Sequence, residues 1–302
     1  AFLDRDNIAY KLELTNSSGE AIALAREAAV SAVRQQNTAP VEEGHNSGNK
    51  EPAGQECIKA IVAAGGDGTV NEVINGLMQA KDALGIKRSE ADSNVEFPLF
   101  GVIPVGRGND FAYGAGVPHD VEAACRLLNG DTRYLMDVGL VTGGLYPQGR
   151  YFGNGIGIGF DTLVGLEAAE VTWIPGFLGY VFGALKMLAV YPKAPYVRIT
   201  YGPHFTQHQD QKVVEAFSPQ ISVMNGRRMG GTFYMAPDGD TSDSFLNLCM
   251  AKGNLKRRQL LRAIGQYTRG SQADNPHIFI DKASHYQIEA LEGGLVCHAD
   301  GE

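Results

Sequence analysis

One segment limits the possible folds more than any other, because it joins a short apolar run to a helical pattern through glycines. The run from Ile61 to Ala64 is typical of a parallel strand covered on both faces, and Gly65-Gly66-Asp67-Gly68-Thr69 follows it directly. Thr69 is a plausible helix N-cap. Apolar residues then recur at the spacing of one helical face, at Val70, Val73, Ile74, Leu77 and Met78. Such a junction predicts a phosphate-binding loop, because glycines let the backbone approach a ligand and a helix N-terminus offers free N–H groups.

Asp67 needs a separate explanation, since a carboxylate inside a phosphate loop repels phosphate. We expect it to hold Mg²⁺, directly or through water. The alternative is a tight strand-to-helix turn in which Asp67 is only a turn former.

A second glycine-rich loop occurs between Phe100 and Ala112, again after an apolar strand. Arg107 could clamp a phosphate through two parallel hydrogen bonds. Asn109 and Asp110 could fix the loop or contact a nucleotide.

Together the two loops resemble those of the diacylglycerol kinase catalytic family, soluble lipid kinases that include sphingosine and ceramide kinases and are distantly similar to NAD kinases. The family pattern Gly-Gly-Asp-Gly-Thr-x-Asn-Glu is matched from Gly65 to Glu72. The pattern Pro-x-Gly-Thr-x-Asn-Asp-Phe-Ala is matched from Pro104 to Ala112, with Arg107 where the family usually has Thr. Further family landmarks follow in the expected order, at Tyr134–Leu140, Tyr151–Asn154, Ile158–Asp161, Val223–Gly231, Ala236-Pro237 and Asp300–Glu302.

The resemblance implies ATP and Mg²⁺ as cofactors and assigns most of the nucleotide contacts to the two loops. Thr15 is added because it lies where the family has a further contact at the end of its second strand. The implied cofactor-binding residues are Thr15, Gly65, Gly66, Asp67, Gly68, Thr69, Asn71, Glu72, Gly106, Arg107, Asn109 and Asp110.

The implied catalytic residues are Asp67, Asp300 and Glu302, because the family places its proton acceptor within the Asp-Gly-Glu at 300–302. Phosphoryl transfer needs a carboxylate near the acceptor hydroxyl, which loses its proton only as the bond to phosphorus forms. The sequence does not separate the roles of Asp300 and Glu302.

A second metal site is implied around Asp243, where the family binds a structural Mg²⁺. Asp243 supplies the carboxylate, Asp240 and Phe245 supply backbone carbonyls, and Ser244 stands where the family has Gly. The alternative is a solvated acidic turn. The EF-hand pattern fails here, because the glycine and the glutamate of a calcium loop are missing.

The order of the patterns predicts two domains. Residues 1–137 are expected to form an NAD-kinase-like α/β nucleotide-binding domain with a mostly parallel sheet, lacking the family's first strand and beginning just before a second strand at Asn7–Leu14. Residues 138–302 are expected to form a β-rich sandwich with a catalytic C-terminal segment. Its expected strands are Tyr196–Tyr201, Gln220–Val223 and Phe245–Met250, with the alternating glycines of Gly153–Gly159 in a strand or turn.

Composition narrows the remaining possibilities. The net charge of −8 argues against a nucleic-acid partner. Four scattered cysteines, Cys57, Cys125, Cys249 and Cys297, indicate reduced thiols in a cytoplasmic protein. The segment 37–56 is expected to be a mobile loop. The uncharged segment 171–185 is short for a membrane span and is expected to be a buried or cleft-lining helix.

The segment Lys252–Arg269 contains six basic residues and no acid, interleaved with leucines. It predicts either contact with a membrane surface or an ordinary amphipathic helix that packs its leucines on the core.

The sequence therefore predicts an ATP-dependent, Mg²⁺-requiring lipid kinase that associates peripherally with membranes. Its acceptor would be a lipid hydroxyl at a membrane surface, of diacylglycerol, sphingoid or phosphatidylglycerol type, and a homodimer is a further expectation. The alternatives are an NAD-kinase-like enzyme and a catalytically weak, nucleotide-regulated lipid-binding protein.

Overall fold

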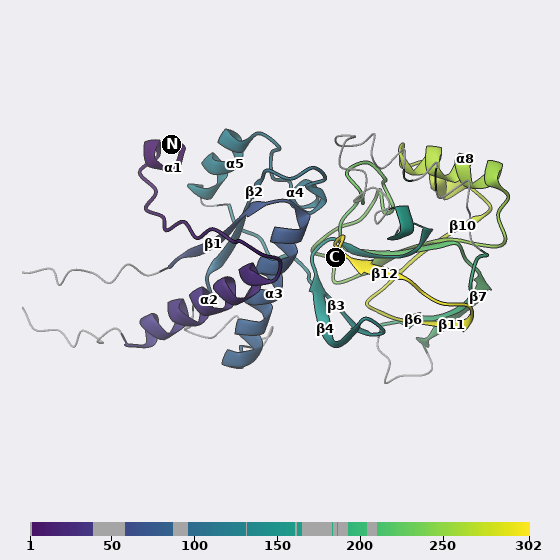
Figure 1. Ribbon diagram of the computed structural model, residues 1–302, viewed down its shortest axis with the longest axis horizontal. Coiled ribbons are helices and arrows are strands. Elements are labelled where there is room, and N and C mark those ends of the chain that lie inside the picture. The colour runs from purple at the N-terminus through teal and green to yellow at the C-terminus, as the bar shows by residue number, and fades with distance from the viewer. Residues whose placement is uncertain are drawn as a thin grey trace, which may run out of the picture.

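The computed structural model describes residues 2–38, 58–86, 96–130, 132–160, 162–164, 183, 186, 193–203 and 210–302. The chain forms two bodies side by side, one built mainly of helices around a short sheet and the other mainly of strands (Figure 1). The elements of the first are α1 (Phe2–Arg5), α2 (Glu20–Thr38), β1 (Ala60–Gly65), α3 (Asp67–Leu84), β2 (Leu99–Pro104), α4 (Asp110–Gly114) and α5 (Val121–Leu128).

The second body contains β3 (Gly139–Gly143), β4 (Tyr146–Phe152), β5 (Gly155–Gly159), β6 (Tyr196–Gly202), β7 (Lys212–Phe217), β8 (Gln220–Met224), β9 (Leu246–Ala251), α8 (Arg257–Tyr267), the 3-10 helix η2 (Gln272–Asp274), β10 (Ile278–Ala283), β11 (His285–Glu292) and β12 (Cys297–Ala299). The predicted strands in this half therefore form, within one residue of the expected bounds.

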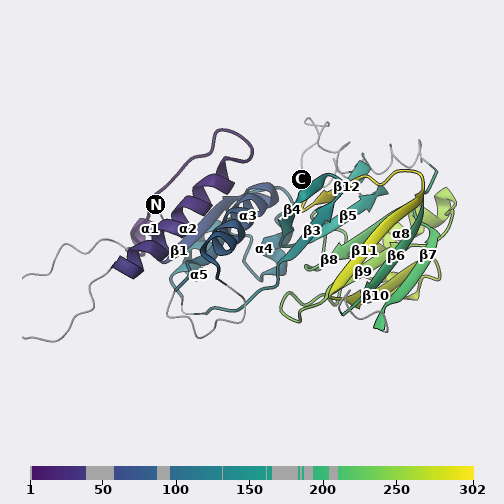
Figure 2. The same cartoon turned by 90° about the horizontal axis from the view of Figure 1, so that it is seen from below.

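Strands β1 and β2 are parallel and in register from Ala60 opposite Leu99 to Gly65 opposite Pro104, which confirms the predicted α/β arrangement. Helices α2 and α3 lie side by side over one face of this sheet (Figure 2). Alanine, valine, isoleucine and leucine side chains of these two helices bury Ala63 of β1 and Val102 of β2. We expected both faces of this sheet to be covered, and in the described residues the second face is covered only in part. Helix α5 shields Gly101 there, but Val62 stays 36% exposed.

One expectation about the helix starts is wrong. Helix α3 begins at Asp67 with Gly66 as its N-cap, so Thr69 lies inside the first turn and is not the cap. Helix α2 begins at Glu20, whose carboxylate accepts the backbone N–H of Ser17, as a capping-box acid does.

The expected strand at Asn7–Leu14 does not form. This segment has no regular structure, and Leu12 and Leu14 are 66% and 74% exposed. An extended segment becomes a strand only by pairing its backbone with a neighbour, and none of the described strands pairs with it.

Other expectations fall where the chain is not described. The segment 37–56 lies outside the described residues beyond Thr38, and 171–185 lies outside them apart from position 183. Cys57 and Asp161 also lie outside, whereas Cys125, Cys249 and Cys297 form no disulfide among the described residues. Within the described ranges no helix is long and apolar enough to cross a bilayer.

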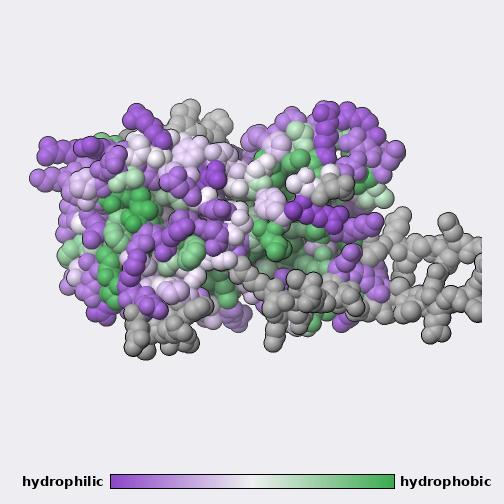
Figure 3. Space-filling model, turned by 180° about the vertical axis from the view of Figure 1, so that it is seen from behind, coloured by the Kyte–Doolittle hydropathy of each residue, from purple (hydrophilic) through white to green (hydrophobic). Residues whose placement is uncertain are grey.

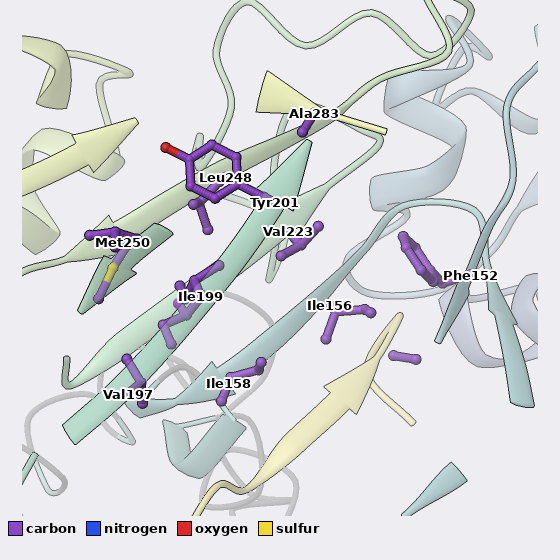
Figure 4. Close-up of a cluster of buried hydrophobic side chains, with 13 residues drawn as sticks. Phe152, Ile156, Ile158, Val197, Ile199, Tyr201, Val223, Leu248, Met250 and Ala283 are labelled. Atoms are coloured by element: carbon purple, nitrogen blue, oxygen red, sulfur yellow. The ribbon is translucent and has the colours of Figure 1, made fainter. Parts of the chain in front are cut away.

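The second domain is the expected β-sandwich. A five-stranded antiparallel sheet in the order β10-β9-β8-β5-β12 faces a three-stranded sheet in the order β11-β6-β7. Figure 4 shows the core between them, where Val197 and Ile199 of β6 meet Ile156, Ile158 and other aliphatic side chains of the larger sheet.

Alternate residues of β9 point to opposite faces of the larger sheet, as the two-residue period of a strand requires. Leu248 and Met250 point into the sandwich, while Cys249 and Ala251 point outward. The outward face is covered by α8, so this helix lies on the outside of the sandwich. Viewed from behind, the surface is largely hydrophilic, with hydrophobic residues gathered in limited areas (Figure 3).

Candidate active site

The two glycine-rich loops meet at the carboxyl edge of the parallel strands. Val105 N–H donates to the carbonyl of Gly65 across 3.1 Å, which ties the second loop to the end of β1. A Cβ atom on Gly106 would overlap the backbone of Gly66, so this contact requires glycine. A Cβ on Gly65 would likewise meet the side chain of Thr69. Two backbones thus lie together where open α/β sheets bind their ligands.

Asn109 holds the second loop in shape. Its Oδ1 accepts the N–H of Gly106 at 3.0 Å, and its Nδ2 donates to the carbonyl of the same residue at 2.9 Å. Asn109 is buried and adopts a left-handed conformation, with φ of 54°. Of the two expected roles for this residue, these contacts support fixing the loop.

Asp67 is the first residue of α3 and reaches across to the second loop. Its Oδ1 accepts the N–H of Phe111 at 3.2 Å, and its Oδ2 lies 2.8 Å from the position that a Cβ on Gly108 would occupy. Burial raises the pKa of this carboxyl group. A carboxylate held here is available to a cation that accompanies a bound phosphate.

Asp110 forms a second carboxylate beside Asp67. Burial, followed by the negative charge of Asp67, raises the pKa of Asp110 to about 7. Both of its oxygens accept the N–H of Gly231 at 3.0 Å, so the second domain contributes directly to this part of the site.

Arg228, which the sequence did not single out, links the two domains. Its Nε donates to Asp110 Oδ1 at 3.0 Å, and its Nη2 donates to the carbonyl of Gly108 at 3.1 Å. Its Cζ lies 3.9 Å from the ring centroid of Tyr113, in the geometry of a cation–π contact. The only available signal was a pair of arginines within the family landmark Val223–Gly231.

Asp300 is buried, and its carboxylate is fully occupied by hydrogen bonds. Oδ1 accepts the N–H groups of Asn154 and Gly155 at 2.9 and 2.8 Å, and Oδ2 accepts those of Gly153 and of the Asn71 side chain at 2.8 and 2.9 Å. Burial raises the pKa of the Asp300 carboxyl group, although these hydrogen bonds act in the opposite direction. Asp300 thus fastens the turn before β5 to helix α3.

Glu302 lies two residues further on and behaves differently. Its side chain is exposed, and one carboxylate oxygen lies so close to Gly68 that a Cβ there would overlap it. The hydroxyl of Tyr146 donates to the backbone carbonyl of Glu302 at 2.7 Å. An exposed carboxylate therefore faces the first glycine loop, and the two residues that the sequence left equivalent have distinct surroundings.

Four further residues that were predicted as nucleotide contacts have different surroundings. The carboxylate of Glu72 accepts the backbone N–H groups of Gly19 at 2.6 Å and Ala21 at 3.1 Å, so it anchors the start of α2 instead of facing the loop. Asn71 is fully buried, and its side chain is engaged by Asp300 and Tyr151. Thr15 and Arg107 are exposed.

The loop around Asp243 is ordered by its own side chains. Asp243 Oδ1 accepts the N–H of Phe245 at 3.0 Å, and Oδ2 pairs with Lys282 Nζ at 3.2 Å. Asp240 accepts both the N–H and the hydroxyl of Ser242. Ser244 adopts a left-handed conformation with φ of 65°, which the glycine of the family pattern would adopt more easily. Within the described residues no group of three or more His, Cys, Asp or Glu side chains could hold a metal.

Comparison with known proteins places this geometry in a family. Residues 1–141 match the model of the diacylglycerol kinase catalytic domain, and residues 154–302 match that of the YegS C-terminal NAD kinase beta sandwich-like domain. The chain is 30% identical to "Diacylglycerol kinase" of Bacillus subtilis over 257 residues, 84% of this chain and 74% of that protein. It is 28% identical to "Lipid kinase YegS" of Escherichia coli over 263 residues, 86% of this chain and 77% of the other. A solved diacylglycerol kinase structure from Bacillus anthracis aligns with a TM-score of 0.62 at 24% identity, covering 95% of this chain and 77% of that one, and so shares the fold.

Proposed function

This chain belongs to the diacylglycerol kinase catalytic family, and we propose that it transfers the γ-phosphate of ATP to a hydroxyl group of a lipid. One observation carries the proposal beyond family membership. The two glycine loops, a carboxylate at the start of α3 and the exposed carboxylate of Glu302 converge on one edge of the β1–β2 sheet. Direct phosphoryl transfer needs this combination, because the protein must hold the nucleotide, offset its charge and accept a proton.

In this proposal the nucleotide phosphates lie against Gly65–Thr69 and Pro104–Asp110. The absence of Cβ atoms at Gly66, Gly68 and Gly106 supports such contact, since the backbones can approach a ligand closely. The first turn of α3 leaves free N–H groups for an anion. Arg107 of the second loop is exposed, which supports the proposal that its guanidinium contacts a phosphate.

Asp67 and Asp110 are the residues that would hold Mg²⁺ with the nucleotide. Two adjacent carboxylates with raised pKa fit a cation, since its charge would offset both their mutual repulsion and the cost of burying them. Bound Mg²⁺ would supply positive charge to the phosphate oxygens. The chain itself orients Asp67 through the N–H of Phe111 and Asp110 through Arg228 and Gly231.

Glu302 is the proposed proton acceptor, and Asp300 positions it. The exposure of Glu302 and its place over Gly68 leave its carboxylate accessible to an acceptor hydroxyl. Asp300 already accepts four hydrogen bonds and is shielded from solvent, so its role is to fix the Asp-Gly-Glu turn. A base must lie within hydrogen-bond reach of the proton that it takes, which favours Glu302.

The proposed acceptor is a primary or secondary hydroxyl on a diacylglycerol, sphingoid or phosphatidylglycerol lipid presented at a membrane surface. The names of the relatives support a lipid, because one is called a diacylglycerol kinase and another a lipid kinase.

The decisive experiment is a transfer assay with γ-labelled ATP against a panel of these lipids, against NAD, and without acceptor, each with and without Mg²⁺. Label on a lipid and not on NAD is the expected result. Label on NAD alone would favour an NAD-kinase-like enzyme. Nucleotide binding without transfer to any acceptor would favour a nucleotide-regulated lipid-binding protein.

A further inference from the structure

Helix α8 carries a group of cations on the outside of the sandwich. Lys256, Arg257, Arg258 and Arg262 are all exposed, and the segment 252–269 around them contains no acid. We propose that this group, the α8 cation face, is the surface with which the protein lies on an anionic bilayer. The inference rests on the proposed lipid acceptor, because it names the surface on which that acceptor would be met.

The helix is held rigidly beneath these cations. Leu255, Leu260, Ala263 and Tyr267 are buried against the outward face of the five-stranded sheet. The two alternatives for this segment therefore concern different faces of one helix: the leucines pack on the core, and the cations face solvent. Leu261 stays 46% exposed beside them and offers an apolar contact of the kind that interfacial helices insert.

Three of these four cations are not tied to acidic side chains of the described residues. Some exposed cations elsewhere pair with carboxylates, as Arg198 does with Glu215 and Lys212 with Asp281. Lys256, Arg258 and Arg262 form no ion pair with an acid in the described ranges. The chain has a net charge of −8, so this local excess of positive charge is the part of the molecule that an anionic surface attracts. The molecule would therefore turn α8 toward such a surface.

The face is also connected to the candidate active site. At the end of α8 the carbonyl of Tyr267 accepts the N–H of Tyr234 at 2.8 Å. The ring of Tyr234 packs edge-on against Tyr113 of the first domain, 6.1 Å between centroids, and Tyr113 lies under Arg228. The eleven residues of α8 span about 16 Å at 1.5 Å per residue, so its first cations lie about that far along the helix from Tyr267.

A bilayer fits this surface better than a nucleic acid does. Nucleic-acid binding needs a basic footprint that dominates its domain, whereas this chain is acidic outside a single helix. A flat anionic surface needs only one cationic face with an apolar side chain at its centre.

The test is cosedimentation of the whole chain, without ATP, with vesicles of phosphatidylglycerol and phosphatidylcholine in equal parts and with vesicles of phosphatidylcholine alone. Binding is expected only to the anionic vesicles and is expected to fall as salt is raised. Replacing Lys256, Arg257, Arg258 and Arg262 together by Gln should weaken it by ~100-fold or more, because each cation near such a surface contributes roughly a factor of five.

Matched controls separate this surface from net charge and from misfolding. Replacing Lys11, Arg26, Lys59 and Arg133 by Gln makes the same change in charge on the first domain and should leave vesicle binding near normal. Changing the three α8 arginines to Lys keeps the charge and should retain binding. A competing oligonucleotide should not displace the vesicles.

The proposal is overturned if the α8 Gln variant binds anionic vesicles as the native chain does, if the control variant loses binding equally, or if the oligonucleotide displaces the vesicles. Because this assay needs no phosphoryl transfer, its outcome is independent of the kinase assay. A chain that binds through α8 yet labels no lipid would overturn the proposed function and leave the bilayer contact standing.

Discussion

Arg228 of the second domain donates its Nε–H to Asp110 of the first domain across 3.0 Å, with the two side chains only 16% and 8% exposed. The pair lies where the second glycine loop meets the sandwich, and Arg228 also holds the carbonyl of Gly108. The relative position of the two domains is thus fixed at the same residues that are proposed to meet the nucleotide.

Removing Arg228 should therefore affect both stability and nucleotide binding. Arg228→Gln leaves a buried carboxylate without its cation, and loss of one partner from a buried pair costs about 3 kcal/mol. We expect the KM for ATP to rise by ~10-fold or more, with a smaller effect for Arg228→Lys. Arg227→Gln is the control, because that side chain is exposed and, among the described residues, donates to the carbonyl of Gly239 outside the loop. Equal effects of both substitutions on KM would contradict the role of Arg228.

Asp110 should give the stability of the protein a characteristic pH dependence. Its pKa is raised to about 7 in the folded state, whereas an unfolded Asp titrates near about 4. The contribution of proton uptake to stability is therefore fully present below about pH 4 and is lost as the pH rises toward 7. Asp110→Asn does not titrate, so its stability relative to the native chain should increase between these pH values and then level off. Urea unfolding of both proteins at several pH values measures this, and a constant difference would refute it.

Asp67→Asn tests the proposed Mg²⁺ ligand. The change keeps the size of the side chain and removes its charge, so phosphoryl transfer should slow by at least ~100-fold, as for loss of one important electrostatic contact. The melting temperature should change little. Near-normal turnover would exclude the role.

Asp300 and Glu302 should separate into a structural and a chemical role. Asp300→Asn replaces an acceptor of four hydrogen bonds by a group that is partly a donor, and should lower the free energy of unfolding by about 3 kcal/mol or more. Glu302→Gln should leave the unfolding curve unchanged and slow transfer by ~100-fold or more. The reverse assignment, with Asp300→Asn stable and inactive, would mean that Asp300 is the base.

The loop around Asp243 should respond to Mg²⁺ if it is a metal site. A metal that binds only the native state raises its stability by mass action. Mg²⁺ without nucleotide is expected to raise the melting temperature of the native chain and not that of Asp243→Ala. Lys282→Gln should enhance the shift, because the amine competes for the carboxylate in the structure. Equal shifts in native and Asp243→Ala proteins would place the metal elsewhere.

The parts of this fold that depend on neighbouring residues could be predicted from the sequence. The run Ile61–Ala64 and the glycines after it define a strand, a tight turn and a helix within one short segment, and β1 and α3 form there. Polar and apolar residues alternate over Gln220–Val223, which is the two-residue period of a strand, and β8 forms there.

What could not be predicted depends on contacts between distant segments. Glu72 matches a nucleotide-binding pattern, but its environment is set by Gly19 and Ala21, more than fifty positions away. The place of Asp300 depends on three consecutive N–H groups at the start of β5, and the role of Arg228 depends on how the domains meet. The strand expected at Asn7–Leu14 failed for a similar reason, since strand propensity does not supply a pairing partner.

The hydrogen bond between Asn71 and Asp300 joins residues 229 positions apart. Protein synthesis proceeds from the N-terminus, so the first glycine loop exists in the growing chain long before the carboxylates that complete the site have been made. Closing so long a connection also makes the last step of assembly slow relative to local folding. A ribosome-bound fragment that contains the first glycine loop therefore still lacks Glu302, and the proposed phosphoryl transfer should begin only after Asp300 has met helix α3.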